Sequence, residues 1–190
     1  TCYVNPIGFD REMAELARAA GCPGMEIGTD SGCNEILERL RKGFTIDQVR
    51  SLHEICLDVG IPDCHTFILG TQGETLDHVH RTLDFVVDLE PFGAILRSWV
   101  DDNEAVDSTL RRERTRLRAQ IEEVLVERKQ GYPYWIIPPL KINFDRSLFR
   151  RLRRSGLRGP LWQHIRRFPT ATETRTQGQP DPQTSSGGSG

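Results

Sequence analysis

The chain has 190 residues and a formal net charge of −2, and its residues are 37% hydrophobic and 27% charged. This composition is ordinary for a globular protein, and no apolar run approaches the roughly 20 residues that a bilayer-spanning helix needs. No signal peptide opens the chain, and its five cysteines lack the C-x-x-C spacing of zinc or redox sites. We therefore predict reduced thiols and a cytoplasmic location. Because the first residue is Thr1 and not Met, we expect the chain to be part of a longer polypeptide.

Strand and helix patterns alternate through the first half of the chain. Short runs at residues 2–4, 25–28, 65–69 and 93–96 predict strands, and amphipathic helices are predicted between them. Asp10, Thr45 and Thr75 stand at the predicted starts of three of these helices. Strands separated by helices indicate βαβ units with a parallel sheet, so the fold class is α/β. Four strands are too few for a closed eight-stranded barrel, but they fit an arc of one, a partial β/α barrel.

The second half has a different pattern, and we predict a mostly helical extension over residues 98–168. A long charged helix is expected from Ser108 to Lys129, followed by an aromatic, proline-rich segment at 131–140 that suits neither a helix nor a central strand. Residues 169–190 consist mainly of Thr, Ser, Gly, Pro and Gln, which predicts a disordered tail.

The charges are also divided between the two halves. Residues 1–90 contain 7 basic and 16 acidic side chains, whereas residues 91–190 contain 18 and 11. Between positions 141 and 167, nine basic residues accompany a single acid, Asp145. This segment could bind nucleic acid or an anionic membrane surface, or it could dock on the acidic half with its arginines solvated.

Two strand-to-helix junctions contain the residues best suited to chemistry. Gly28–Gly32 follows the second predicted strand, and Gly70–Thr75 follows the third. Parallel α/β proteins bind ligands at the carboxyl ends of their strands, where glycines allow close backbone approach and short carboxylates can bind hydroxyl or ammonium groups. A turn followed by a helix cap explains each junction equally well when it is taken singly. His53 and Cys56, at positions i and i+3 of a predicted helix, suit the core or solvent rim better than a metal site, and we predict no metal ligands in this chain.

Four ordered segments within residues 1–97 resemble the radical S-adenosylmethionine (radical SAM) family. Ala20–Gly32 (AGCPGMEIGTDSG) is similar to the family's "aGC…v.iGiESG" segment, and Leu40–Thr45 (LRKGFT) is similar to its "l.Kg.t". Gly60–Pro62 and Phe67–Thr75 (FILGTQGET) are similar to its "Gi…fi.GlPGET". The resemblance implies the later βα units of a partial barrel, usually of six strands, with residues 98–168 as a cap over the substrate opening.

The resemblance also implies roles for individual residues at the S-adenosylmethionine pocket. Asp30 stands where the family has Glu, and with Ser31 it would contact the ribose or the methionyl ammonium. Ile68 would pack on adenine, and Gly70 would let the backbone approach the cofactor. Glu74 would mainly order the loop. The remaining implied cofactor-binding positions are Gly28 at the first junction and the backbone at Leu96.

The family holds a [4Fe–4S] cluster with three cysteines at C-x-x-x-C-x-x-C spacing, and this chain has no such spacing. We therefore expect the chain alone to be inactive, with the cluster ligands in an upstream portion of the same polypeptide. The intact enzyme would use an electron donor to generate a 5′-deoxyadenosyl radical from S-adenosylmethionine, and it would act on a small-molecule or peptide substrate. Many relatives with this pattern also carry cobalamin and transfer methyl groups. The competing hypothesis is a non-catalytic α/β binding module whose basic segment contacts nucleic acid, the less favoured partner, or a membrane surface.

Overall fold

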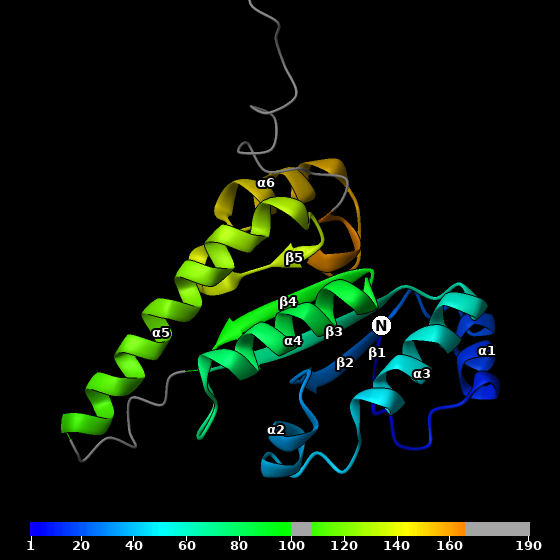
Figure 1. Cartoon of the computed structure of the whole chain (residues 1–190). Helices are drawn as coiled ribbons and strands as arrows, with labels where there is room; N and C mark the ends of the chain where they lie inside the picture. The colour runs from blue at the N-terminus through cyan, green and yellow to red at the C-terminus, as the bar shows by residue number, and fades with distance from the viewer. Residues whose placement is uncertain (100–107, 166–190) are drawn as a thin grey trace, which may run out of the picture.

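The computed structural model describes residues 1–99 and 108–165, in which five strands form one parallel sheet in chain order (Figure 1). The strands are β1 (Cys2–Val4), β2 (Met25–Asp30), β3 (Asp63–Leu69), β4 (Gly93–Ser98) and β5 (Trp135–Ile136). Every adjacent pair is parallel, so each connection returns the chain to the same end of the sheet. A parallel sheet in which spatial order follows chain order is the arrangement of a β/α-barrel arc, as the sequence predicts.

The described residues also form six α-helices and three short 3₁₀ segments, of which η2, α6 and η3 follow the last strand. The bounds of the α-helices are α1 (Arg11–Ala19), α2 (Asn34–Arg39), α3 (Ile46–Val59), α4 (Leu76–Leu89), α5 (Ser108–Arg128) and α6 (Arg146–Ser155). The 3₁₀ segments are η1 (Lys129–Gly131), η2 (Pro138–Leu140) and η3 (Leu161–Gln163). Thr45 and Thr75 each close a capping box at the start of α3 and α4, which explains why those two boundaries are predictable. None of the described helices has the length and apolar character that a bilayer crossing requires.

Helices α1–α5 cover one face of the sheet. Phe67 and Leu69 of β3 pack with Leu96 of β4 and with buried side chains of α4 and α5. A second cluster joins Met25 and Ile27 of β2 to α1 and α3. Alternate residues of each strand therefore enter the helix-covered core, and the residues between them lie on the opposite face.

That opposite face is covered by η3 at its amino-terminal end. Trp162 packs there with Cys64, and its indole Nε1 donates a hydrogen bond to Glu26 Oε1 at 3.2 Å. A side chain at position 24 would come within 2.4 Å of the Trp162 ring, so Gly24 is required for this docking. Towards the carboxyl end of the strands, Gly28 is exposed and Ile68 is only half-buried. The face is therefore accessible at the carboxyl ends of the strands, where parallel sheets bind ligands.

The extension after β4 is mostly helical and also contributes one short strand to the sheet. Residues 131–140 contribute β5, in which Trp135 pairs with Ala94 of β4, so the extension adds an edge strand to the sheet and is not only helical. Tyr134 and Trp135 are buried in the core, and Tyr132 stacks on the Trp135 ring at 4.7 Å between centroids. Tyr134 and Trp135 therefore belong to the core, and Tyr132 packs against it. After α6 the described chain ends in the short 3₁₀ segment η3, and the predicted tail at 169–190 lies outside the described residues.

Candidate functional site

The two predicted junctions lie at the same edge of the sheet. Asp30 is the last residue of β2 and pairs with Phe67 of β3, and Gly70 directly follows the end of β3. A bulge between Gly28 and Asp30 shifts the register, and Asp30 adopts a positive φ of 64°. Such a backbone is uncommon for residues other than glycine, although Asp and Asn tolerate it best. The bulge ends the strand and redirects the Asp30 side chain.

Asp30 forms an ion pair with Lys42, with Oδ2 and Nζ 2.7 Å apart. Both side chains are largely buried, and the Lys42 ammonium also lies 5.6 Å from the centre of the Phe44 ring. Around Gly28, a Cβ position would lie 3.8 Å from Lys42 Nζ and 3.9 Å from Asp30 Oδ1. A carboxylate and an ammonium therefore flank exposed backbone at the open face. Sequence reasoning did not assign Lys42 to the site, although the Leu40–Thr45 segment contains it.

Ser31 faces the helix layer and not the open face. Its Oγ lies 3.2 Å from Thr82 Oγ1 of α4 and accepts a hydrogen bond from the backbone N–H of Cys33. The backbone N–H of Gly32 also donates to Thr82 Oγ1, at 3.1 Å. Ser31 therefore fixes the turn after β2 against α4, and Thr82 is a supporting residue that the sequence alone did not reveal.

Glu74 orders the second junction through hydrogen bonds to its backbone. Its Oε2 accepts hydrogen bonds from the backbone N–H groups of Gly70 and Thr71 and from the Thr71 hydroxyl, at 2.7, 2.9 and 3.1 Å. Burial raises the pKa of Glu74 above its usual range, although these hydrogen bonds act in the opposite direction. Its Oε1 is buried and has no hydrogen-bond partner among the described residues. Arg39 of α2 donates to the Gly73 carbonyl at 2.6 Å and so connects the end of α2 to the second junction.

The three other predicted positions do not all face the open side. Ile68 does, because its neighbours Phe67 and Leu69 occupy the core. Leu96 directs its side chain into the core, so only its backbone is available at the open face. Gly70 has a φ of 86°, and an added Cβ would lie 3.1 Å from Ile121 of α5. The positive φ of this turn and the close packing of α5 explain why residue 70 is a glycine.

The cysteines do not form a cluster site. Cys2 and Cys22 lie 3.6 Å apart, Sγ to Sγ, near the amino-terminal end of the sheet. Cys33, Cys56 and Cys64 are buried, and burial raises the pKa of each thiol. The described part of the chain therefore presents no set of three thiolates for an iron–sulfur cluster.

A buried polar cluster lies between α3 and β3. Asp63 Oδ2 bonds with His53 Nδ1 at 2.6 Å and with His65 Nε2 at 3.0 Å, and Thr29 Oγ1 is 2.7 Å from His65 Nδ1. Burial alone would raise the pKa of Asp63, but the hydrogen bonds from both imidazoles hold it well below its usual range. His53 is therefore buried within a hydrogen-bonded network that satisfies the charge of Asp63.

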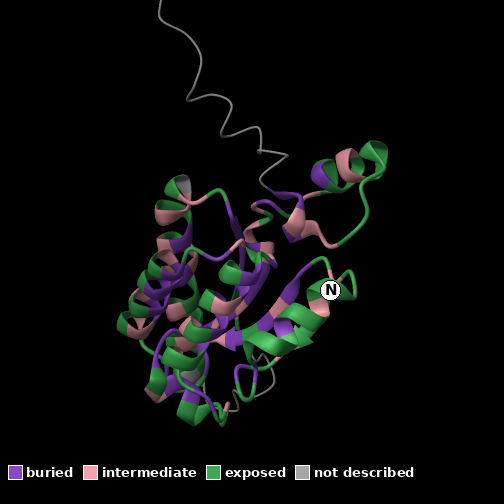
Figure 2. Ribbon diagram, turned by 90° about the vertical axis from the view of Figure 1, so that its right-hand side faces the viewer, coloured by how far each residue is buried: buried purple, intermediate pink, exposed green. Residues whose placement is uncertain are grey.

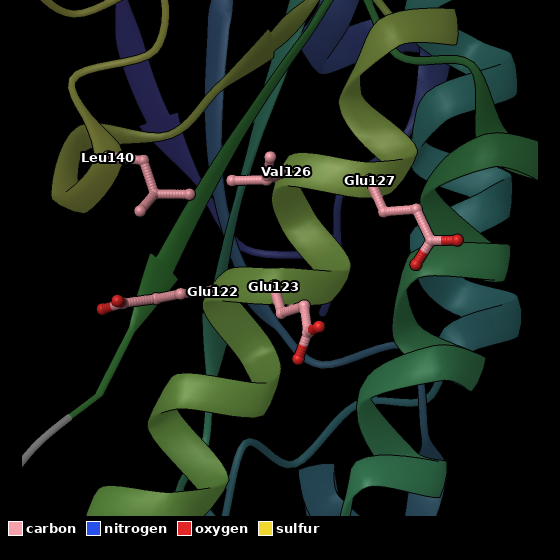
Figure 3. Close-up of a pocket in the computed structure, with 5 residues that line it drawn as sticks. All are labelled: Glu122, Glu123, Val126, Glu127 and Leu140. Atoms are coloured by element: carbon pink, nitrogen blue, oxygen red, sulfur yellow. The ribbon is translucent and has the colours of Figure 1, made fainter.

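A shallow groove on the outer side of α5 is a poor candidate site. Glu122, Glu123, Val126 and Glu127 of α5 line it together with Leu140. Figure 3 shows that the three carboxylates point in different directions, so they do not converge on one ligand. Glu122 is also paired with Arg118 at 2.9 Å.

Comparison with known proteins finds similarity in the first half of the chain. The model of the radical SAM superfamily matches residues 1–86. Tryptophan 2-C-methyltransferase of Streptomyces laurentii is 32% identical over 94 residues, which cover 46% of this chain and 16% of that protein. The methyltransferase TsrM of Kitasatospora setae, solved with cobalamin and a [4Fe–4S] cluster bound, has 29% identity over 50% of this chain and 19% of its own, with a TM-score of 0.46.

A third comparison concerns the fold alone. The archaeal Elp3 of Methanocaldococcus infernus, solved without its N-terminus, covers 82% of this chain and 42% of its own with a TM-score of 0.55 and 14% identity. This likeness agrees with the predicted barrel arc. The chain spans less than a fifth of the length of the two methyltransferases. With four family-like segments in order on a parallel β/α sheet, and a superfamily match over residues 1–86, this part of the chain is similar to the radical SAM superfamily.

Proposed function

We propose that residues 1–97 supply part of the S-adenosylmethionine pocket of a radical SAM enzyme. The observation that carries this proposal is the group of Gly28, Asp30, Lys42 and Ile68 at the accessible carboxyl edge of β2 and β3. It combines an apolar side chain, exposed backbone and two opposite charges, as a nucleoside with an amino-acid moiety requires.

Each residue has a role suited to its chemistry. Lys42 engages Oδ2 of Asp30, so the other carboxylate oxygen is available to accept hydrogen bonds from ribose hydroxyls or the methionyl ammonium. The Asp30 side chain is one methylene shorter than the family's Glu, and Lys42 holds it in place. Ile68 packs on adenine and excludes water from that side of the pocket. Glu74 keeps the loop after β3 closed through its three hydrogen bonds.

S-adenosylmethionine, bound beside a reduced [4Fe–4S] cluster, supplies 5′-deoxyadenosyl-radical chemistry in this superfamily. The cysteines of this chain do not fit such a cluster, so this chain's part is to bind and orient the cofactor. We further propose that the whole enzyme acts on a small molecule or peptide, with methyl transfer as the favoured reaction because a curated relative is named a methyltransferase. Cobalamin and an electron donor belong to that same proposal.

Calorimetric titration of the 190-residue chain with S-adenosylmethionine tests the pocket. We expect saturable binding that weakens at least tenfold in Asp30→Ala and in Ile68→Asp, a loss of about 1.4 kcal/mol or more. Val126→Ala, on the outer side of α5, is the control and should bind normally. Absence of saturable binding, or equal affinity in all variants, would overturn the proposal.

Anaerobic reconstitution with iron and sulfide tests the interpretation of the cysteines. The chain alone should acquire no stoichiometric [4Fe–4S] absorption and form no 5′-deoxyadenosine with reductant. A stoichiometric cluster would show that its thiols had been misinterpreted.

A further inference from the structure

Helix α6 is an arginine-rich helix that stands apart from the helix layer of the sheet (Figure 2). Asp145 caps it by accepting a hydrogen bond from the Leu148 N–H at 2.7 Å, and Gly156 ends it in the left-handed conformation. The helix is therefore defined at both ends by local sequence signals. The radical SAM family match, which ends at residue 86, does not include it.

The two sides of α6 have different roles. Leu148 is buried and Leu152 is half-buried, so the apolar side faces the protein. Arg146, Arg150 and Arg153 follow one another at i, i+4 and i+7, and all three are exposed. With Arg154, also exposed, they form the outward side of the helix, here called the α6 arginine face.

The charge of this face is not neutralised within the described part of the chain. No described carboxylate pairs with its four arginines, whereas Arg11, Arg81 and Arg128 each pair with one on the body of the protein. Four like charges on about two helical turns repel one another, and a polyanion would relieve that repulsion.

Two aromatic rings flank the face. Phe144 and Phe149 are 40% and 44% exposed, and they pack edge to face with centroids 5.2 Å apart. On the helix, Phe149 lies three positions after Arg146 and four before Arg153, so an aromatic ring and two guanidinium groups are neighbours on the surface. The two packed rings and the arginines therefore combine apolar and cationic groups on one surface.

We infer that the α6 arginine face binds single-stranded nucleic acid, with the arginines on consecutive phosphates and Phe149 stacked on a base. Guanidinium groups bind phosphate oxygens in bidentate fashion, and aromatic rings beside a basic track are the usual platform for unpaired bases. A membrane surface fits less well, because a helix lying in the interface must present its apolar side to the lipid. In α6 that side is already packed on the protein.

Fluorescence anisotropy of a labelled 20-nucleotide single-stranded RNA, titrated with the full chain at several salt concentrations, tests the inference. We expect binding that weakens with salt. Arg150→Gln/Arg154→Gln should weaken binding at least tenfold and reduce the salt slope by about 1.4, since each phosphate contact on a single strand contributes about 0.7. Phe149→Ala should weaken binding at least fivefold without changing that slope, because stacking releases no counterions.

The matched control is Arg112→Gln/Arg116→Gln, which removes the same charge at the same spacing from an exposed part of α5. Its affinity for the RNA should stay within twofold of the parent chain. An equal loss in both pairs would mean that only total charge matters, and it would overturn the inference. So would arginine-dependent binding to vesicles of phosphatidylcholine and phosphatidylserine, or to polyglutamate, at an affinity equal to or above that for RNA.

Discussion

Lys42 Nζ lies 2.7 Å from Asp30 Oδ2, and this contact connects the turn after α2 to the end of β2. The two side chains keep 24% and 17% of their exposure, so the pair is neither fully solvated nor fully buried. It holds a carboxylate at a backbone position with positive φ, beside the exposed Gly28. The pair therefore prearranges a charged group at the accessible edge of the sheet.

Removing either partner should affect ligand binding more than stability. Lys42→Met and Asp30→Asn each keep the local backbone, since Asn tolerates positive φ and Met retains the apolar stem. We expect each to lower the free energy of unfolding by less than about 1 kcal/mol, as partly solvated ion pairs contribute little. S-adenosylmethionine binding should fall several-fold in both. A double-mutant cycle in urea and by calorimetry measures the coupling, and additive effects in both assays would contradict a working pair.

Glu74 should make the protein less stable as the pH rises. Its folded-state pKa is raised, so the protonated form favours folding, and this contribution is lost as the pH rises from the ordinary carboxyl value near 4.3 through the raised one. Glu74→Gln keeps an acceptor for the Gly70 and Thr71 N–H groups but cannot ionise. Thermal midpoints between pH 4 and 8 should therefore fall less in the variant.

The control for that measurement is Glu123→Gln on the exposed side of α5, which should follow the parent chain at every pH. If Glu74→Gln shows the same pH profile as the parent, the buried carboxyl does not titrate in this range.

The predictable parts of this fold are those encoded locally. Thr45 and Thr75 cap their helices through contacts three residues away, and these boundaries follow from the sequence alone. Strand β5 does not, because its pairing of Trp135 with Ala94 joins positions far apart in the chain and lies within a proline-rich segment. At the site, Asp30 and Gly70 lie at the same end of the sheet because each stands at the carboxyl end of a strand in a parallel sheet. The inward orientation of Ser31 depends on Thr82 of α4, which no local pattern reveals.

Asp63 should be essential to stability at neutral pH. Its lowered pKa means that the ionised form favours folding, and this contribution is present above about pH 4 and lost as the pH falls through the lowered value. Asp63→Asn should lower the free energy of unfolding at pH 7 by about 3 kcal/mol, because two hydrogen bonds from histidines to a buried charge are weakened. Urea unfolding at pH 7 and at pH 3 measures the change, which should shrink in acid.

Asp58→Asn is the matched control, because Asp58 forms an ion pair with Arg11 on the surface. It should cost less than about 1 kcal/mol at pH 7. Equal losses in the two variants would mean that the buried histidine network contributes no more than a surface pair.

The last prediction concerns Gly32, where the turn after β2 touches α4. An added Cβ would lie 2.6 Å from Phe85 Cβ and 2.9 Å from Thr82 Cα, so the contact is with the rigid part of the helix and no rotamer change relieves it. Gly32→Ala should therefore push α4 outward, strain the Gly32 N–H to Thr82 Oγ1 hydrogen bond and cost about 1–3 kcal/mol. Phe85→Leu should not rescue it, because the clashing Cβ remains.

Gly131→Ala, which meets no atom within 4 Å, should be neutral or slightly stabilising in the same urea series. Since the displaced turn contains the residue after Ser31, Gly32→Ala should also weaken S-adenosylmethionine binding, and unchanged stability together with unchanged binding would show that the turn and α4 are not tightly packed.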